Sequence, residues 1–422
     1  MRFNTLEQWL GWQTTLHPKE IDLGLERVSD VWHRLKPEGL QSLVVTVAGT
    51  NGKGSSVALL ESIYRHAGYQ VGAYTSPHLV RYNERIRING QEVSDSALCQ
   101  AFERVDQARG QTILTYFEFA TLAALILFAE QNLDLVILEV GLGGRLDAVN
   151  IIDADVALIT TVDLDHTDWL GDSRQQIGLE KAGIMRSNRP VVVGDSAIPE
   201  SVPEYAQKIG AELYLGGSHF NLSPGGDTWQ WQTKGDDLLT LPQFRFNGKG
   251  QVSNTSAVIM VCRLLQSSLP LNQMQIIDGL NQVSLRGRAQ LIEGEPSILL
   301  DVAHNTQSVS SLKEHLDRLG WPGRIIALFG LLKDKDAKSI VEIIKPAVSG
   351  WYLVDLPGDR GQSAEQLAKA VRQSGVESSV HCHHNFADAL KAAQTEAEPQ
   401  DLLLIFGSFL IVGDALQHLH PE

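Results

Sequence analysis

The feature that most constrains the fold is a strand, a glycine-rich turn and a helix that follow one another near the N-terminus. Leu43-Val44-Val45-Thr46-Val47 is a short apolar run typical of a strand buried on both faces. Residues 48–54 form the turn, and residues 55–67 repeat apolar side chains with helical period before Gly68, where a left-handed helix cap belongs. Residues 70–74 predict the next strand. This order predicts an α/β fold built around a mostly parallel sheet.

The turn reads Gly49-Thr50-Asn51-Gly52-Lys53-Gly54-Ser55 and predicts a phosphate-binding loop. Glycines let backbone N–H groups approach phosphate oxygens, the helix start adds its positive end, and Lys53 supplies a point charge. The alternative is an ordinary glycine-rich turn, but the order of strand, Gly-Lys pair and helix favours the phosphate site. The motif is incomplete, because Val47 replaces its first glycine and Gly54 replaces the Ser or Thr that usually binds Mg²⁺. We therefore expect a metal-binding oxygen from elsewhere in the chain.

Polar side chains at the ends of predicted strands are the candidates for that oxygen. They are Ser76 after the strand ending at Tyr74, Glu139 in the strand 133–140, and Asp163, Asp165, His166 and Asp168 after the strand 156–162. Parallel strands present these residues at one edge of the sheet, and carboxylate and hydroxyl oxygens suit Mg²⁺. Alternatively, Asp and Ser at strand ends cap the helices that follow. Their shared position beside a phosphate loop favours the metal site.

Three other features keep more than one interpretation. Arg81, Arg85 and Arg87 form a basic cluster that is either a solvated edge strand or a grip on an anionic substrate. Lys181, from the residues alone, is a solvated helix lysine. His381-Cys382-His383-His384 suggests zinc, but neighbours in a strand alternate sides and no cysteine pair at metal-site spacing exists. We therefore interpret this histidine run as a surface cluster without a metal.

Composition limits the partners of the protein. The 35 Lys and Arg residues against 50 Asp and Glu residues give a net charge of −15, which argues against a sequence-independent nucleic-acid partner. The longest apolar run, 119–129, is shorter than the roughly 20 residues that cross a bilayer, and the N-terminus lacks the apolar region of a signal peptide. The 3 cysteines are far apart, which suits a reducing compartment. We expect a soluble, cytoplasmic protein without a membrane partner.

The strand and helix pattern predicts two domains. Residues 216–250 are rich in Gly, Asp, Trp and Phe and predict a small sheet excursion, which a helix over 252–266 follows. The α/β pattern restarts near residue 286. We predict an N-terminal P-loop-type domain with a mostly parallel sheet over 1–285. A smaller, Rossmann-like C-terminal α/β domain is predicted over 286–422.

Further motifs occur in an order that resembles the dihydrofolate synthase/folylpolyglutamate synthase family of the Mur ligase superfamily. In the first domain they are the phosphate loop, Thr75-Ser76-Pro77-His78-Leu79, residues 138–147, residues 165–171 and Glu180-Lys181-Ala182-Gly183-Ile184. In the second domain they are Gly287-Arg288, Asp301-Val302-Ala303-His304-Asn305, Asp334-Lys335-Asp336 and Gly407-Ser408-Phe409. The resemblance covers nearly the whole chain and is close to the bifunctional bacterial members. Arg286 and Thr306 replace prolines that the family usually has, which affects loop rigidity more than chemistry.

The resemblance implies an ATP-dependent ligase that adds L-glutamate to 7,8-dihydropteroate and to reduced folates through an acyl phosphate. The implied catalytic residues are Lys53, Lys181, His304 and Ser408, with Lys181 matching the family's carbamylated lysine. The implied ATP contacts are Asn51, Gly52, Lys53, Gly54, Ser55, Asn254, Arg288 and Asp301. A pair of Mg²⁺ ions is implied, with the protein ligands Ser76, Glu139 and His166. The implied pterin-binding residues are Ile21, Asp22, Leu23, Thr115, Tyr116, Phe117, Glu118, Leu146, Asp147 and Ala148.

Two other functions stay open at this stage. A cell-wall Mur ligase would use the same chemistry, but the pterin-type segments would then lack a purpose. A regulatory P-loop module without ligase activity would not need a nucleotide set in a second domain. We expect a monomer that acts on small molecules, because no long coiled-coil seam is evident in the sequence.

Overall fold

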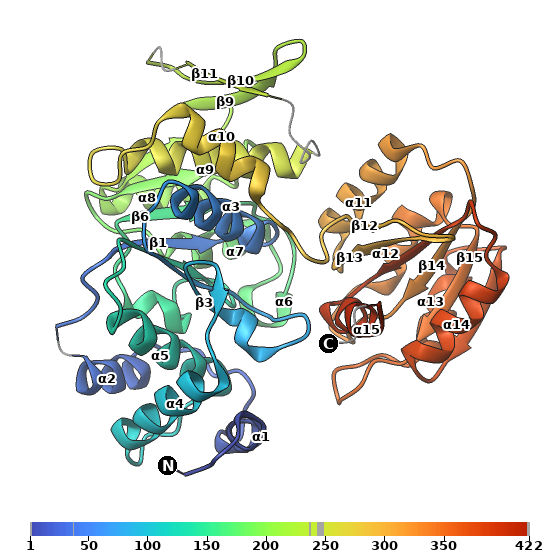
Figure 1. Ribbon diagram of the computed structural model, residues 1–422, viewed down its shortest axis with the longest axis horizontal. Coiled ribbons are helices and arrows are strands. Elements are labelled where there is room, and N and C mark those ends of the chain that lie inside the picture. Colours follow the sequence, from blue (N-terminus) through green and yellow to red (C-terminus); the bar gives the residue numbers. More distant parts are fainter. Residues whose placement is uncertain (1, 37, 236–237, 243–248, 420–422) are drawn as a thin grey trace. The chain divides into compact units, whose positions relative to one another are not determined.

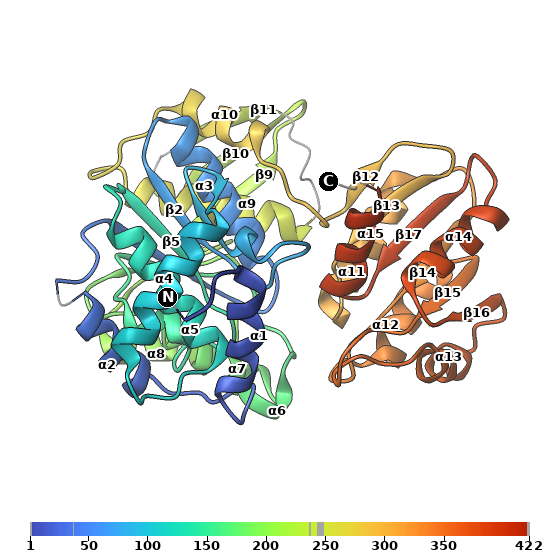
Figure 2. The same cartoon turned by 60° about the horizontal axis from the view of Figure 1, so that its bottom comes forward.

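The computed structural model describes residues 2–36, 38–235, 238–242 and 249–419, which form two compact units. The first unit runs to His78 and then from Tyr82 to Val283. The second unit takes Leu79–Arg81 and the chain from Ser284 onward. Each unit has helices around its own sheet (Figures 1 and 2). Among the described residues, no helix combines the length and the apolar character needed to cross a membrane.

The first unit is built on an eight-stranded sheet with the order β4-β3-β2-β5-β1-β6-β7-β8. The six parallel strands are β1 (Leu43–Ala48), β2 (Val71–Tyr74), β5 (Leu135–Glu139), β6 (Val156–Ile159), β7 (Pro190–Val193) and β8 (Glu212–Leu215). The short strands β3 (Ile86–Ile88) and β4 (Gln91–Glu92) extend the sheet in antiparallel fashion. Strand β1 lies between β5 and β6, so the predicted phosphate loop leaves the middle of the sheet.

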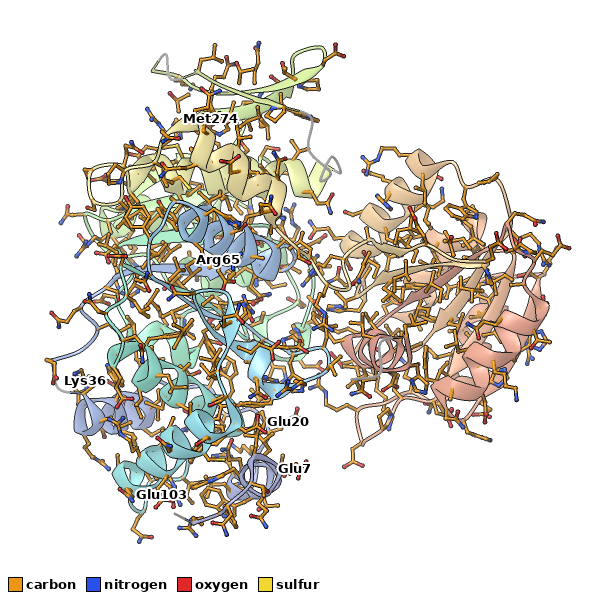
Figure 3. The ribbon with its side chains drawn as sticks, viewed as in Figure 1. Glu7, Glu20, Lys36, Arg65, Glu103 and Met274 are labelled. Atoms are coloured by element: carbon orange, nitrogen blue, oxygen red, sulfur yellow. The ribbon has the colours of Figure 1, made fainter. Side chains whose placement is uncertain are left out.

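Helices cover both faces of this sheet because alternate strand side chains enter two separate cores. Val44 of β1 lies in one core and Val45 in the other. The first core is completed by α1 (Leu6–Leu16), α2 (Glu26–Leu35), α4 (Asp95–Arg109), α5 (Tyr116–Ala129), α6 (Thr167–Leu170), α7 (Arg174–Ala182) and α8 (Ser201–Ile209). The second is completed by α3 (Lys53–His66), α9 (Lys249–Leu264) and α10 (Gln273–Gln282). Side chains fill the space between these layers, while Met274 of α10 is exposed (Figure 3).

A small antiparallel sheet packs onto the second core of this unit. Its strands are β9 (Phe220–Pro224), β10 (Thr228–Thr233) and β11 (Leu238–Pro242), with β10 in the middle. Trp231 of β10 is buried and its indole N–H donates to the carbonyl of Ser256 in α9 (3.0 Å). The sheet excursion predicted for 216–250 is thereby found, apart from residues 236–237 and 243–248, which lie outside the described residues.

The second unit has a six-stranded sheet with the order β12-β13-β17-β14-β15-β16. Its strands are β12 (Gln290–Ile292), β13 (Ser297–Asp301), β14 (Ile325–Phe329), β15 (Gly350–Val354), β16 (Ser379–His383) and β17 (Leu402–Phe406), and only β12 is antiparallel. One face is covered by α11 (Thr306–Leu319), α12 (Ala337–Ile344) and α13 (Ala364–Gln373), the other by α14 (Phe386–Glu396) and α15 (Phe409–Leu419). The predicted class, two α/β domains with parallel-rich sheets, is confirmed.

One short segment is assigned differently by sequence and structure. Leu79–Arg81 falls inside the predicted domain 1–285 but packs with the second unit. The Leu79 carbonyl lies where a side chain on Gly413 of α15 would be, and the Leu79 side chain lies 3.5 Å from where a Cβ on Gly287 would be. The contacts divide the rest of the chain between Val283 and Ser284, whereas the sequence placed the boundary after residue 285. A boundary drawn along the sequence cannot express an insertion of this kind, because it depends on contacts between distant residues.

Candidate functional site

The phosphate loop is held between β1 and α3 by close backbone approaches. Gly52 has a φ of 86°, and a Cβ at this position would overlap the side-chain amide of Asn254 on α9. Gly49 has a φ of 151°, and a Cβ there would overlap the hydroxyl of Thr160. Both positions therefore need glycine for space as well as for conformation. Asn254 is buried, and its Oδ1 atom has no hydrogen-bond partner in the part of the chain that the structure describes.

Hydrogen bonds fix the loop to the end of β6. The Thr50 N–H donates to the Thr161 carbonyl (2.8 Å), and the Thr160 hydroxyl donates to the Asn51 carbonyl (2.7 Å). The Lys53 ammonium donates to the carbonyl of Gly49 (3.0 Å), so its charge stays folded over the loop. The first turn of α3 has no side-chain cap. Its N–H groups and positive end suit an anion, as the sequence predicts.

The three predicted metal ligands lie at or after the carboxyl ends of β2, β5 and β6, along the same sheet edge as the loop. Glu139 is the last residue of β5, pairs in register with Val47 and is buried. Its Oε2 atom accepts the N–H of Ser76 (3.2 Å). His166 adopts a φ of 50°, and its N–H donates to the Asp165 carboxylate (2.9 Å). A buried carboxylate beside a serine loop is a donor set that fits Mg²⁺.

This arrangement is not a complete cage of protein ligands. Among the described residues, no group of three or more His, Cys, Asp or Glu side chains could hold a metal ion. The candidate set has only two members of those types, Glu139 and His166, and its third member is the Ser76 hydroxyl. Mg²⁺ commonly keeps waters and phosphate oxygens in its shell, so an incomplete protein set suits a nucleotide-bound ion.

Lys181 of α7 is buried, with 3% of its surface exposed. The interpretation from the residues alone, a solvated helix lysine, is therefore wrong. Burial, together with the charge of Lys53, lowers the pKa of Lys181 to about 7, although Asp165 and Asp147 act in the opposite direction. The helix packs tightly here because Gly144 leaves no room for a side chain against the Lys181 backbone. The site thus holds two lysines close to the phosphate loop.

Asp147 is the most buried member of the predicted pterin surface. Its carboxylate accepts the N–H groups of Leu142 (2.8 Å) and Val149 (3.1 Å). Burial raises the pKa of Asp147 to about 7, and these N–H groups and Lys53 oppose the rise. Ala148 starts the short helix η2 (Ala148–Ile151) directly beside it. Backbone donors therefore hold the Asp147 carboxylate in place, and its pKa lies close to neutral pH.

The early pterin-type segment is tied to the start of α5 by an ionic chain. Arg27 donates from Nε to Glu118 Oε2 (3.0 Å) and from Nη1 to Asp22 Oδ2 (2.5 Å). Glu118 also accepts the N–H of Thr115 (2.8 Å), completing the capping box of α5. The Phe117 ring lies against Gly141. The structure thus brings the segments 21–27, 115–118 and 141–148 into one part of the first unit.

The predicted residues of the second unit gather at the carboxyl edge of its sheet. Asp301 ends β13, accepts the N–H groups of Ala289 and Ala303 (2.8 Å each), and has its pKa raised by burial. The ring of Phe409 lies 5.7 Å from the Arg288 guanidinium and 6.1 Å from the His304 ring. Phe409 is part of the Gly407-Ser408-Phe409 motif, but nothing in the sequence distinguishes it as a site residue.

Ser408 is buried and directly precedes α15. Its hydroxyl accepts the N–H of Ile411 (3.2 Å). The preceding Gly407 has a φ of 113° and lies against Phe329 and the carbonyl of Gly330. Because Asp301 and Phe406 pair in register, Ser408 follows the strand next to Asp301. Adjacent strand ends thus position Ser408 and Asp301 at one sheet edge.

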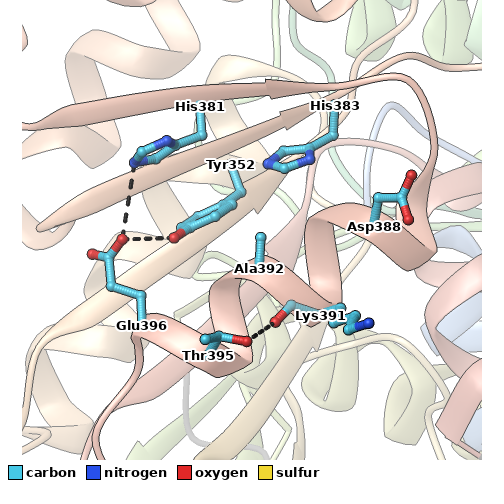
Figure 4. Close-up of a pocket in the computed structure, with 8 residues that line it drawn as sticks. All are labelled: Tyr352, His381, His383, Asp388, Lys391, Ala392, Thr395 and Glu396. Carbon is cyan, nitrogen blue, oxygen red and sulfur yellow. Dashed lines mark hydrogen bonds and ion pairs between the residues drawn. The ribbon is translucent and has the colours of Figure 1, made fainter.

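The histidine run forms an aromatic layer on edge strand β16. His381 and His383 lie on one face and stack on Tyr352 of β15, with ring centroids 4.9 and 5.7 Å apart. The Tyr352 hydroxyl donates to Glu396 of α14 (2.7 Å), at the rim of a shallow cavity of about 480 Å³ (Figure 4). Each imidazole therefore has an aromatic neighbour, which accounts for their shared orientation.

Comparison with known proteins places the chain in a family. The Mur ligase middle domain matches residues 47–262, and the Mur ligase glutamate ligase domain matches residues 287–409. The dihydrofolate synthase/folylpolyglutamate synthase of Escherichia coli (strain K12) is 43% identical over 98% of this chain and 95% of its own length.

Solved structures agree with this placement over the whole chain. Escherichia coli FolC in complex with DHPP and ADP has a TM-score of 0.93 at 42% identity, covering 99% of this chain and 98% of that one. A bifunctional folylpolyglutamate synthase/dihydrofolate synthase with Mn, AMPPNP and L-glutamate bound has a TM-score of 0.90 at 41% identity, with the same coverage. The chain therefore belongs to the dihydrofolate synthase/folylpolyglutamate synthase family of the Mur ligases.

Proposed function

We propose that this protein is an ATP-dependent ligase that joins L-glutamate to 7,8-dihydropteroate, forming dihydrofolate, and to reduced folates, forming folylpolyglutamates. One geometric observation carries the proposal. The glycine phosphate loop and the buried Glu139 lie at one sheet edge, and the buried Lys181 of α7 is close enough to feel the charges of Lys53 and of Asp147 in the pterin-type segment. The names of full-length relatives support the same activity.

The reaction must first make a carboxylate reactive. A carboxylate is a poor electrophile because its negative charge is delocalised. Transfer of the γ-phosphoryl group of ATP to the acceptor carboxylate gives an acyl phosphate and ADP. The α-amino group of glutamate then attacks the acyl carbon, and the tetrahedral intermediate expels phosphate and loses a proton to give the amide. Lys53, folded over the loop, would stabilise the charge on the transferring phosphoryl oxygens.

Ser76, Glu139 and His166 are the residues proposed to hold Mg²⁺. When bound, Mg²⁺ neutralises phosphate charge and fixes the orientation of the triphosphate. The carboxylate of Glu139 is the strongest donor of this set. It is fixed by the Ser76 N–H and by its place at the end of β5. His166 and the Ser76 hydroxyl complete the protein side of the site.

We propose that Lys181 is carbamylated in the working enzyme. A neutral amine adds to CO₂ and releases one proton, leaving an N-carboxylate in place of an ammonium. The lowered pKa of about 7 keeps a large share of the amine neutral at physiological pH. The product anion would relieve the repulsion between Lys181 and Lys53 and add a carboxylate beside the proposed metal ligands.

We propose that polar side chains of the second unit serve the same reaction. Asp301 and Arg288 are assigned to the nucleotide, with Asp301 toward the ribose. His304 and Ser408 are assigned to the reacting phosphate and the incoming glutamate. In the first unit, Asp147 and the ring of Phe117 are assigned to the pterin. The monomeric state and the cytoplasmic location stay predictions from the sequence.

A single assay tests the proposal against its alternatives. ADP and phosphate release is measured with dihydropteroate, with tetrahydrofolate or with a UDP-linked cell-wall precursor, each with and without L-glutamate. Products are identified by mass. Release that requires glutamate and either folate-type acceptor, with a product heavier by one glutamyl residue, supports the proposal. Stimulation only by the UDP-linked precursor, or turnover indifferent to every acceptor, contradicts it.

A further inference from the structure

Arg85 is a buried cation without an acidic partner among the described residues. It ends the short helix η1 (Tyr82–Arg85) and is 9% exposed. Its Nε atom donates to His78 Nδ1 (2.9 Å), but no carboxylate lies within ion-pair distance in the described ranges. Buried arginines are normally paired, because burying an uncompensated charge costs free energy. A buried Arg85 without a carboxylate partner therefore calls for an explanation.

Arg87, two residues further on, shows the ordinary arrangement. Its guanidinium donates to both carboxylate oxygens of Glu61 (2.7 to 3.2 Å) and to the Thr75 hydroxyl (3.1 Å). It is therefore neither a solvated edge residue nor available for substrate. Arg81 packs with the second unit. Of the three arginines in the predicted basic cluster, Arg85 is the one whose contacts leave a charge to be neutralised.

The surroundings of Arg85 fix its guanidinium in one place. Its central carbon lies 5.3 Å from the Tyr82 ring and 5.7 Å from the Tyr116 ring. In addition, the Nε–H of Arg85 donates to the Nδ1 atom of His78. Two aromatic rings and one acceptor thus hold the base of the guanidinium. The N–H donors on its two Nη atoms make no hydrogen bond to any described residue.

The neighbours of Arg85 belong to two parts of the proposed site in the first unit, the pterin surface and the segment that carries Ser76. Tyr116 belongs to the proposed pterin surface at the start of α5. His78 lies two residues after Ser76, and the Arg85 carbonyl accepts the N–H of Thr75 (2.8 Å). Arg85 thus contacts both the proposed pterin surface, through Tyr116, and the segment that carries Ser76. Arginine is the side chain best suited to a carboxylate, because its planar fork donates two parallel hydrogen bonds.

We propose that Arg85 binds a carboxylate of the acceptor substrate, with its fixed Nη atoms as donors. The inference rests on the proposed function, because it takes the acceptor to be a pteroate or a folate. Dihydropteroate has a single carboxylate, which is the group that reacts. Reduced folates carry a terminal glutamyl residue, which adds an α-carboxylate that does not react. A comparison of the two acceptors therefore shows whether Arg85 binds the reacting carboxylate or the α-carboxylate.

The test compares Arg85→Gln and Arg85→Lys with wild type. The matched control is Arg104→Gln, which removes a surface arginine of the same unit that pairs with Glu130. Binding of dihydropteroate and of tetrahydrofolate is measured calorimetrically without ATP, and KM and kcat are measured with it. We expect Arg85→Gln to weaken acceptor binding and raise its KM at least tenfold. Binding of an ATP analogue should stay unchanged. Arg85→Lys should lie between, because an ammonium lacks the fork.

The pattern of loss identifies the anion. An equal loss with both acceptors assigns Arg85 to the reacting carboxylate, and a loss confined to tetrahydrofolate assigns it to the α-carboxylate. Unchanged binding of both acceptors overturns the proposal. A melting curve of each variant separates unfolding from lost binding.

A measurement on the wild-type enzyme does not depend on how the variants fold. A carboxylate-free analogue, dihydropteroate amide, should bind at least tenfold more weakly than dihydropteroate. Equal affinity of the amide and the acid overturns the proposal for the reacting carboxylate. The corresponding test for the α-carboxylate uses tetrahydrofolate amidated at that position. A wild-type protein that ligates neither acceptor refutes the proposed function itself, before any variant is compared.

Discussion

Lys181 shows how strongly a single residue depends on its tertiary surroundings. Lys181 is 3% exposed and close to a second lysine, so its ammonium form is destabilised in the folded protein. Its pKa is therefore lowered to about 7. In the unfolded chain the same group has a pKa near 10.5. The unfavourable contribution to folding is therefore fully present below pH 7 and fades as the pH rises toward 10.5. Carbamylation would remove it at neutral pH.

The carbamate predicts a defined pH and CO₂ dependence. Below pH 7 the ammonium predominates and cannot react with CO₂, so carbamylation should increase as the pH rises from 6 to 8. Enzyme depleted of CO₂ should lose activity and regain it with bicarbonate, faster at pH 8 than at pH 6. Uptake of ¹³C-bicarbonate, followed as a carbamate resonance, measures the modification directly.

Lys181→Ala is the control for this prediction. It should lack the carbamate resonance and lose most activity, which small carboxylic acids should partly restore. Full activity of Lys181→Ala without any bicarbonate dependence would count against the carbamate.

Residue types and spacing predict the phosphate-loop residues, because these residues are consecutive in the sequence. The burial of Lys181 was not predictable in this way. Its surroundings come from Gly144 and from strand ends far away in the sequence. Arg85 and Arg87 look alike in the sequence, and only the fold gives Glu61 to one and aromatic rings to the other.

At the scale of elements, α3 offers a matched pair of glycines at its two ends. Gly52 and Gly68 have similar φ values, 86° and 95°, so alanine is strained at both. They differ in space, because a Cβ at Gly52 would overlap the Asn254 amide, whereas no atom lies within 4 Å of a Cβ at Gly68. The pair therefore separates backbone strain from the packing of the phosphate loop.

We predict that Gly68→Ala lowers stability by about 1–2 kcal/mol and leaves nucleotide affinity near the wild-type value. Gly52→Ala should bear the same strain and also displace the loop or Asn254, weakening ATP binding by more than tenfold. Denaturant unfolding and calorimetric titration with an ATP analogue measure the two effects. Equal nucleotide affinity in both variants would refute the assignment of Gly52 to the nucleotide site.

The elements themselves were largely predictable where apolar runs are long. Strands β1 and β2 agree with the predicted runs 43–47 and 70–74 to within a residue at each end, because each is a buried run of the sheet. An edge strand was only one of two interpretations of the arginine segment that contains β3, and β4, the edge strand of the sheet, was not predicted. With three residues in β3 and two in β4, neither strand is long enough to give a periodic signal. Strand β3 is set by pairing with β2, and β4 by pairing with β3.

At the scale of the whole molecule, the segment Leu79–Arg81 interrupts the first unit and packs with the second unit. Leu79 and Val80 pack against the apolar cluster that α14 and α15 form on their sheet. Gly413 of α15 leaves room for the Leu79 carbonyl, which a Cβ at this position would overlap. Three residues with so few local neighbours carry no sequence signal of a domain change. The packing of Leu79 in the second unit depends on Gly413, which is far away in the sequence.

Gly413→Ala tests whether this packing stabilises the second unit. The new Cβ would collide with the Leu79 backbone, which cannot rotate away as a side chain could, so we expect a loss of about 1–3 kcal/mol. Hydrogen exchange of β13, β14 and β17 should become faster, while β1 and β5 of the first unit keep their protection. Gly11→Ala is the control, because it also adds a methyl group to a helix but meets no atom within 4 Å. If Gly413→Ala is as stable as Gly11→Ala, or if both units exchange faster together, Leu79 does not stabilise the second unit specifically.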